Sequence, residues 1–228
     1  MSSGSSNGIQ RLIAFANPRS PVAEAYRQLR TNIQFSSLDR PLKTLLITST
    51  NPEEGKSTTL ANLAISLAQA RHSVVLVDCD LRRPSLHELF GLRNSEGLTS
   101  CLLNPDADHL PLQDSGVEFL RLLTSGALPP NPSELVGSQR MGEVIQILRQ
   151  QADYVLFDAP PIIAVTDAAV LATRVDGVLL VIRAGKTRRE MAQKAKALLE
   201  KVNAHILGVV LNNVKFDSSL HQYYAGKE

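Results

Sequence analysis

Residues 44–57 read TLLITSTNPEEGKS, an apolar run of strand length followed by a turn that ends in Gly-Lys-Ser. Residues 58–70, rich in alanine and leucine, follow as a predicted helix. This order of strand, turn and helix suits a phosphate-binding loop, because the start of a helix offers free N–H groups and a favourable dipole to an anion. The stretch therefore predicts an α/β fold that binds a nucleotide.

Five further apolar runs of strand length lie at residues 74–78, 118–124, 154–158, 177–182 and 205–211. Helical patterns lie before and between them, over about 22–38, 58–70, 133–151 and 187–202, and the last has capping-box spacing at Thr187-Arg-Arg-Glu190. Strands rich in Val, Ile and Leu that alternate with helices indicate a parallel sheet covered on both faces. We predict a doubly wound, mostly parallel α/β sheet of the P-loop NTPase type with Walker A, A′ and B sites.

The predicted domain runs from residue 20 to 217, with an N-terminal helical arm over about 20–40 that begins at Ser20-Pro21. Residues 1–19 open with the composition of a linker and are expected to be flexible. The polar segment 218–228 is expected to be a mobile tail.

Composition narrows the function classes. The chain is 43% hydrophobic and 20% charged, which is typical of a soluble globular protein, and its net charge of +2 is too small to favour nucleic acid as a partner. The two cysteines stand far apart, which argues against a zinc or iron–sulfur site. No apolar run reaches the roughly 20 residues that a membrane-spanning helix needs.

The turn after the first strand supplies the expected nucleotide contacts. Lys56 is expected to reach the β- and γ-phosphates of ATP, and the Ser57 hydroxyl to bind Mg²⁺. Thr50 stands where the general pattern has its first glycine, and Glu53 stands where many such loops have another. If position 53 needs a positive φ, a glutamate there costs about 1–2 kcal/mol. The predicted nucleotide-binding residues of the loop are Pro52, Glu53, Glu54, Gly55, Lys56, Ser57 and Thr58, with both glutamates expected to point to solvent.

Three aspartates follow predicted strands. Asp78 and Asp80 come at the end of the second run, and Asp158 ends the fourth. The carboxyl ends of parallel strands meet at one edge of a sheet, where α/β proteins bind their ligands. Carboxylates there can hold Mg²⁺ or accept the proton of an attacking hydroxyl. We predict Ser57, Asp80 and Asp158 as metal ligands, and Lys56 with the three aspartates as the catalytic group.

Several motifs together make the chain resemble the bacterial tyrosine kinases of capsule and exopolysaccharide synthesis. They are Glu24-x-x-Arg27-x-x-Arg30, Pro52-x-Glu54-Gly55-Lys56-Ser57, Asp78-x-Asp80-Leu-Arg82-x-Pro84, Leu128-Pro-Pro-Asn-Pro-Ser-Glu134 and Asp158-x-Pro160-Pro161. The resemblance covers nearly the whole chain from about residue 20. It implies an ATP- and Mg²⁺-dependent protein-tyrosine kinase on a P-loop scaffold.

The resemblance also assigns roles to individual residues. Asp78 looks like the activator of the tyrosine hydroxyl, and Asn212 sits where related ATPases read the adenine edge. The helix face of Glu24, Arg27 and Arg30 is expected to join subunits into a ring, for which an octamer is one expected size. A local Glu–Arg pair on a solvated face is the alternative explanation of these three residues.

The tail and the partners complete this expectation. Tyr223 and Tyr224 resemble the tyrosine-rich tail of the family and are the predicted phosphoacceptors, although family tails usually hold a longer cluster. The expected partners are a transmembrane activator of the polysaccharide co-polymerase type and a cognate tyrosine phosphatase. The expected location is the cytoplasm, at the inner face of the membrane through the activator.

Two other functions stay open at this point. Partition and division-site ATPases share the predicted architecture and act as nucleotide-gated assembly switches. Their loop carries an early signature lysine, whereas this chain has Asn51 there, followed by a proline. A scaffold that binds nucleotide without catalysis is the third possibility, suggested by Glu53.

Overall fold

The computed structural model describes residues 6–36, 42–104 and 109–215 of the 228-residue chain. Its helices are α1 (Ser6–Ile9), α2 (Ile13–Ala16), α3 (Pro21–Phe35), α4 (Lys56–Gln69), α5 (Leu86–Phe90), α6 (Leu98–Leu103), α7 (Pro132–Gly137), α8 (Gln139–Gln151), α9 (Asp167–Ala172) and α10 (Arg189–Lys201). Its strands are β1 (Thr44–Ser49), β2 (Val74–Asp78), β3 (Gln113–Asp114), β4 (Leu120–Leu123), β5 (Tyr154–Asp158), β6 (Gly177–Arg183) and β7 (Ile206–Asn212).

The strands form one sheet in the order β3-β4-β2-β5-β1-β6-β7. Every neighbouring pair is parallel except β3 with β4, which is antiparallel. The predicted doubly wound, mostly parallel sheet is confirmed. The sequence prediction missed β3, since a strand of two residues is too short to show a pattern.

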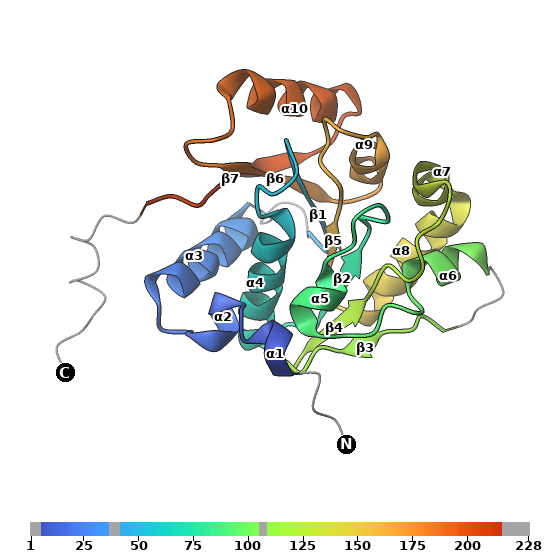
Figure 1. Ribbon diagram of the computed structural model, residues 1–228, viewed down its shortest axis with the longest axis horizontal. Coiled ribbons are helices and arrows are strands. Elements are labelled where there is room, and N and C mark those ends of the chain that lie inside the picture. Colours follow the sequence, from blue (N-terminus) through green and yellow to red (C-terminus); the bar gives the residue numbers. More distant parts are fainter. Residues whose placement is uncertain (1–5, 37–41, 105–108, 216–228) are drawn as a thin grey trace.

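Helices cover both faces of this sheet, α1 to α5 on one side and α6 to α10 on the other (Figure 1). Alternate residues of each strand supply the two cores. Leu46 and Val75 pack with the core under α6 to α10, whereas Leu45 and Val74 pack with the core under α1 to α5. Because side chains of a strand alternate between faces, strands buried on both sides must be apolar throughout.

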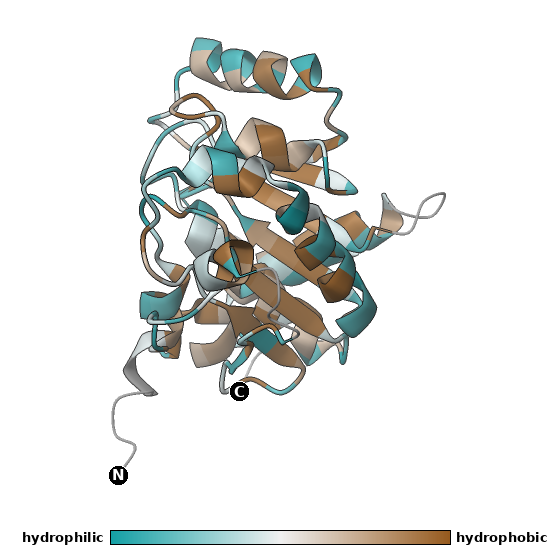
Figure 2. Ribbon diagram, turned by 90° about the vertical axis from the view of Figure 1, so that its right-hand side faces the viewer, coloured by the Kyte–Doolittle hydropathy of each residue, from teal (hydrophilic) through white to brown (hydrophobic). Residues whose placement is uncertain are grey.

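The distribution of hydrophobic residues follows this layering. Figure 2 shows the hydrophobic strands in the middle of the molecule, with the outer helices carrying hydrophilic residues. All six residues of β1 and all five of β2 are buried. The edge strand β7 differs, because its Val209 and Leu211 are more than half exposed.

The N-terminal segment corrects one prediction. Residues 6–16 were expected to belong to a flexible stretch, yet they form α1 and α2, and Leu12 between them is fully buried. The backbone N–H of Ala14 donates to Asn62 of α4, 2.9 Å away. The linker-like composition of the first eight residues hid these contacts, which need α4 as a partner.

Two helix predictions also need correction. The single helix expected over 133–151 is two helices, because Ser138 is extended and its side chain accepts a hydrogen bond from Met141 N to begin α8. The capping box expected at Thr187 is absent from α10, whose N-cap is Arg188. The short helices α5, α6 and α9 were not predicted, since helices of five or six residues are too short for a clear periodicity. For α3, the predicted start holds, with Ser20 accepting from Ala23 N.

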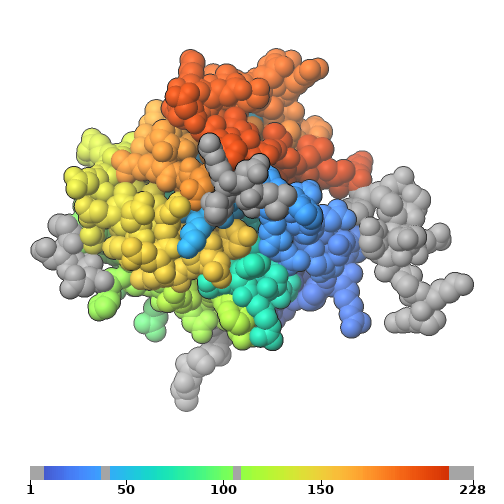
Figure 3. Space-filling model, turned by 180° about the vertical axis from the view of Figure 1, so that it is seen from behind, coloured from blue at the N-terminus to red at the C-terminus, as the bar shows by residue number. Residues whose placement is uncertain are grey.

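The parallel strands begin at one edge of the sheet, the amino-terminal edge, and end at the opposite one, the carboxyl edge. These two edges are built differently. The carboxyl ends of β1, β2 and β5 meet beside the turn that leads into α4. At the opposite edge, Figure 3 shows the light-blue start of β1 against the yellow segment of α8. There Lys43 Nζ lies 3.4 Å from the backbone oxygen of Arg149.

Candidate active site

The turn between β1 and α4 leaves the first N–H groups of the helix available to a ligand. Gly55 is the N-cap of α4, with a φ of 87° and no capping side chain. The backbone angle favours glycine, and a Cβ atom at this position would also lie 2.1 Å from Asn212 Nδ2 and displace that side chain. Uncapped N–H groups and the helix dipole together form an anion site.

Lys56 lies between two aspartates at this edge. Its Nζ is 3.0 Å from Asp80 Oδ2 and 3.1 Å from Asp158 Oδ1. Burial opposes the charge, but attraction to Asp158 and Asp80 outweighs it and raises the pKa of the Lys56 ammonium. The side chain is therefore a fixed positive charge at the mouth of the loop.

Ser57 and Asp158 form a contact that suits a divalent cation. Ser57 Oγ donates to Asp158 Oδ2 at 2.5 Å, and the Asp158 carboxylate is fully buried at the end of β5. Burial raises the pKa of Asp158, although Lys56 and Ser57 work in the opposite direction. Hydroxyl and carboxylate oxygens with phosphate oxygens and water are the ligands Mg²⁺ prefers, so these two residues fit the ion. In the described part of the chain, no three His, Cys, Asp or Glu residues are arranged to hold a metal by themselves. The phosphate oxygens of the nucleotide would have to complete the coordination shell of the ion.

Asp78 lies beside Asp158, its register partner on the neighbouring strand. Its Oδ2 accepts hydrogen bonds from Ser85 N and Leu86 N at 3.0 Å, and its Oδ1 accepts from Asp80 N at 3.2 Å. Burial and repulsion from Asp158 raise the pKa of Asp78 to about 8, despite the N–H of Leu86 and the charge of Lys56. A carboxyl with this pKa is mostly protonated at pH 7, and its ionised form is a stronger base than an ordinary carboxylate.

A cavity of about 670 Å³ opens in front of these groups. Gly55, Lys56, Ser57 and Asp80 line it, whereas Asp78 and Asp158 lie beneath its wall. Its volume falls within the range of small-molecule sites. The sequence placed all three aspartates at this edge, and the structure adds that Asp80 is the one facing the space.

Arg82, in the lining of the cavity, is held by a buried acid that the sequence did not single out. Arg82 Nε lies 2.9 Å from Asp167 Oδ2, and Arg82 Nη2 donates to Ser133 Oγ at 2.9 Å. Asp167 is fully buried at the start of α9 and also accepts from Ser133 Oγ. These contacts hold the segment after Asp80 against α7 and α9. No local pattern marked Asp167, because its partners lie far away in the sequence.

The two loop glutamates behave differently from each other. Glu53 is exposed with a φ of 62°, so the predicted backbone cost applies. Glu54 was expected to point to solvent, but it is only 5% exposed. Its carboxylate accepts from Thr50 N at 2.8 Å and from Thr187 Oγ1 at 2.5 Å. The expectation was wrong because the partner that covers Glu54 comes from the loop after β6.

Two other predicted sites lie outside the cavity. Asn212 Nδ2 donates to the backbone oxygen of Glu54 at 2.9 Å, which places it behind the turn. On α3, Arg27 pairs with Glu24 through a hydrogen bond of 2.6 Å, and Arg30 Nη1 donates to the backbone oxygen of Ser66 at 2.6 Å. The local Glu–Arg pair weighed as an alternative is therefore present, and Arg30 ties α3 to α4. Tyr223 and Tyr224 lie outside the described residues.

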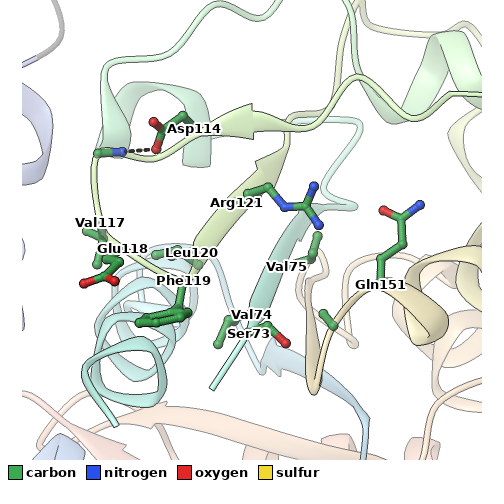
Figure 4. A pocket seen from close by; sticks show the side chains of 12 residues that line it. Ser73, Val74, Val75, Asp114, Val117, Glu118, Phe119, Leu120, Arg121 and Gln151 are labelled. Atoms are coloured by element: carbon green, nitrogen blue, oxygen red, sulfur yellow. Dashed lines mark hydrogen bonds between the residues drawn. The ribbon is translucent and has the colours of Figure 1, made fainter. Parts of the chain in front are cut away.

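Other hollows lie elsewhere on the molecule. A groove of about 720 Å³ runs between α3 and β7, with Val22, Tyr26, Leu29 and Leu211 in its lining. A cavity of about 460 Å³ lies at the amino-terminal edge, among side chains of β2, β4 and α8 (Figure 4). Neither contains the lysine, hydroxyl and acids of the first cavity. None of the helices in the described ranges is both long and apolar enough to cross a membrane.

Comparison with protein families and curated proteins gives consistent matches. The family model ParA, described as NUBPL iron-transfer P-loop NTPase, matches residues 42–223. The chain is 45% identical to the tyrosine-protein kinase YwqD of Bacillus subtilis, over 96% of this chain and 93% of that protein. It is 38% identical to the putative tyrosine-protein kinase CapB of Staphylococcus aureus, over 96% and 97%. With the tyrosine-protein kinase etk of Escherichia coli, identity is 35% over 92% of this chain but 29% of that protein.

Among solved structures, tyrosine kinase domains are more similar to this chain than a cell division ATPase is. The chimerical protein CapA2B2 matches with a TM-score of 0.86 at 38% identity, covering 90% of both chains. The kinase domain of Escherichia coli tyrosine kinase ETK matches with a TM-score of 0.87 at 35% identity, covering 91% of this chain and 82% of that one. The cell division ATPase MinD of Pyrococcus furiosus is more distant, with a TM-score of 0.64 at 25% identity over 74% and 71% of the chains.

Proposed function

The chain belongs to the bacterial tyrosine-protein kinases, and from that premise we propose that it transfers the γ-phosphoryl group of ATP to tyrosines near its own C-terminus, between subunits. The observation that carries this proposal is the position of Lys56, within 3.1 Å of both Asp80 and Asp158 at the mouth of one cavity. A fixed cation beside an uncapped helix start suits a triphosphate.

Binding and orientation of the nucleotide fall to the loop and α4. The backbone N–H groups after Gly55 would surround the phosphates, and the Lys56 ammonium would neutralise charge on the transferring group. Ser57 and Asp158 would hold Mg²⁺, which when bound supplies charge neutralisation at the phosphates. Asn212, which lies outside the cavity, is our proposed contact near the adenine, whereas Pro52, Glu53 and Thr58 line the cavity itself.

Transfer needs an acceptor for the tyrosine proton. The phenolic oxygen forms a bond to the γ-phosphorus, the bond from that phosphorus to the bridging oxygen breaks, and ADP leaves. We propose that Asp78 in its ionised form takes the phenolic proton, because a carboxylate whose pKa burial has raised to about 8 is a stronger base than an ordinary one. Asp80 lines the cavity that the incoming hydroxyl would enter.

The supporting experiment is mass spectrometry of the tail after incubation with Mg·ATP. Phosphate is expected on Tyr223 and Tyr224, and none in the Lys56→Met variant. To test transfer between subunits, Lys56→Met chains are mixed with active chains that carry Tyr223→Phe and Tyr224→Phe. Phosphotyrosine on the Lys56→Met chains supports the proposal. A protein that binds Mg·ATP in the presence of its activator and never gives phosphotyrosine would contradict it.

Assembly and regulation are further parts of the proposal. We propose a ring of subunits joined through the α3 face of Glu24, Arg27 and Arg30, although Arg30 also bonds to α4 within the chain.

A membrane-embedded activator is proposed because the chain matches only 29% of the length of the etk kinase, which therefore contains further sequence. We propose that the output is regulation of capsule or exopolysaccharide synthesis and export, with a tyrosine phosphatase as the opposing enzyme. Deletion of the gene with measurement of surface polysaccharide tests that output.

The partition-type switch remains the second candidate, supported by the similarity to MinD. It predicts ATP hydrolysis and nucleotide-dependent dimerisation without phosphotyrosine. Asn51 at the place of the signature lysine counts against it. The same tail analysis separates the two functions.

A further inference from the structure

We propose that Glu54 is a positioning residue, which braces the phosphate loop against the loop between β6 and α10 through Thr187. Glu54 would thereby set the shape of the loop for the nucleotide without contacting the phosphates. This inference rests on nucleotide binding as proposed above and is independent of tyrosine as the acceptor.

The Glu54 carboxylate turns back into its own loop. It accepts hydrogen bonds from Thr50 N at 2.8 Å, Thr50 Oγ1 at 2.6 Å and Asn51 N at 3.0 Å. Asn51 Nδ2 adds a contact of 3.2 Å to the same carboxylate. The side chain thus satisfies the donors at the start of the turn, which lead out of β1. A buried network whose donors and acceptors are satisfied makes this part of the loop more rigid.

A second contact crosses to a segment more than a hundred residues away. Thr187 Oγ1 donates to Glu54 Oε1 at 2.5 Å and accepts from Arg183 N at 2.8 Å. The Thr187 hydroxyl therefore donates its proton to Glu54 and accepts, through a lone pair, the N–H of Arg183 at the end of β6. From the other side, Asn212 at the end of β7 donates to the Glu54 backbone oxygen. Glu54 thus connects the ends of β1, β6 and β7.

The charge of Glu54 fits this role better than contact with phosphate. Burial acts to raise the pKa of Glu54, but the donors that surround its carboxylate outweigh burial and hold that pKa below its usual value. Glu54 does not line the cavity in front of Lys56, whereas Glu53 and Gly55 on either side of it do. A carboxylate that faced the triphosphate would repel it, so turning it inward removes the repulsion and uses the charge for structure.

Titration with a fluorescent Mg·ADP analogue tests the brace. Thr187→Val keeps the shape of the side chain and removes the hydroxyl, and we expect the affinity for Mg·ADP to fall about tenfold, as for the loss of a hydrogen bond to a charged group. Thr187→Ser restores the hydroxyl and should restore the affinity. Thr173→Val is the matched control, because the Thr173 hydroxyl bonds only within its own exposed turn in the described structure.

A double-mutant cycle with Glu54→Gln identifies the partner. The amide introduced by this substitution keeps the size of the side chain but brings a donor against Thr50 N and Asn51 N. If the two residues act as one brace, Thr187→Val should weaken Mg·ADP binding about tenfold in the wild type and by less than about twofold in the Glu54→Gln background. Additive losses would overturn the pairing.

The outcomes separate this inference from the proposed function. Wild-type protein that fails to bind Mg·ADP would overturn both. Tight binding by the wild type together with unchanged affinity in Thr187→Val, whatever its melting temperature, would overturn the brace alone. A tenfold loss with a melting temperature within the range of the Thr173→Val control supports the brace, since general destabilisation would move both measurements.

Discussion

The two edges of the sheet both carry aspartates, and the two sets are in opposite electrostatic states. At the amino-terminal edge, Asp176 accepts from Lys43 N, from Thr44 N and Oγ1, and from Arg149 Nη1, all within 3.0 Å. Burial opposes ionisation there, but Arg149 and Thr44 outweigh it and lower the pKa of Asp176. Ser73 lowers the pKa of Asp153 at the same edge.

At the carboxyl edge, the acids outnumber their cationic partner. Asp78, Asp80 and Asp158 gather around Lys56, and burial together with mutual repulsion raises the pKa of Asp78 and Asp158. The side chains are of one type and lie at the ends of the same sheet, so the difference lies in their partners. Acids with a full set of donors hold the fold together, whereas buried acids that share one cation mark a site built to receive further charge.

The largest expected effect comes from removing a charge at the carboxyl edge. Asp78→Asn should lower the rate of tyrosine phosphorylation by about 10²–10⁴, the usual contribution of a proton acceptor. The melting temperature should change little, because removing a buried carboxylate with a raised pKa offsets the weakening of its hydrogen bonds from Ser85 N and Leu86 N. Phosphotyrosine formation and thermal unfolding of the same sample measure both quantities. A variant that keeps the wild-type rate would show that another group, with Asp80 as the first candidate, accepts the proton.

The reverse result is expected at the amino-terminal edge. Asp176→Asn should lower the free energy of unfolding by about 1–3 kcal/mol, since it weakens a network of hydrogen bonds and an ion pair. The phosphorylation rate of the folded protein should stay near that of the wild type. Urea unfolding provides the measurement. Asp114→Asn is the control at the same edge, because exposed Asp114 accepts one hydrogen bond, from Gly116 N, and should change stability by less than about 0.5 kcal/mol (Figure 4).

The pH dependence of stability should separate the two edges. Asp176 and Asp153 have lowered pKa values, so the stability they contribute is present above their ordinary value of 3.8 and is lost as the pH falls below it. Asp78 has a raised pKa, so its contribution is present below 3.8 and is lost as the pH rises toward about 8.

Thermal unfolding of the nucleotide-free protein between about pH 3 and 9 checks these signs. The wild type should lose stability at both ends of the range. Asp78→Asn should reduce the loss of stability between about pH 4 and 8 and should not change the loss of stability below about pH 4. Asp176→Asn should reduce the loss of stability below about pH 4. An Asp78→Asn curve parallel to that of the wild type would show that Asp78 has no raised pKa.

The smallest expected effect concerns backbone strain, which both edges share. Glu53 at the carboxyl edge and Arg71 after α4 are exposed residues with φ values of 62° and 66°. Replacing either with glycine should raise the free energy of unfolding by about 0.5–1 kcal/mol, the strain relieved less the entropy cost of glycine. Only Glu53→Gly should also strengthen Mg·ADP binding, by roughly two- to threefold, because Glu53 lines the cavity. An equal gain in affinity from Arg71→Gly would contradict the local explanation.

The sequence by itself determined the sheet and the place of the site. Apolar runs of strand length separated by helical patterns were enough to predict a doubly wound fold, because burial on both faces forces each strand to be apolar throughout. The Gly-Lys-Ser turn and the aspartates after β2 and β5 needed only one further rule, that the carboxyl ends of parallel strands share an edge. Lys56, Asp80 and Asp158 lie together there, as that rule requires.

Only the tertiary structure decided how the site is supported. Glu54 is held by Thr187 across 133 residues of sequence, and Arg82 meets the buried Asp167 across 85. Leu12 is buried although the linker composition of residues 1–8 led to the prediction of a flexible segment over residues 1–19. A local pattern reports which residues can lie on a strand or a helix, but the direction of a loop side chain depends on partners that only folding brings near. For that reason the sequence placed Glu54 in solvent, whereas the fold buries it.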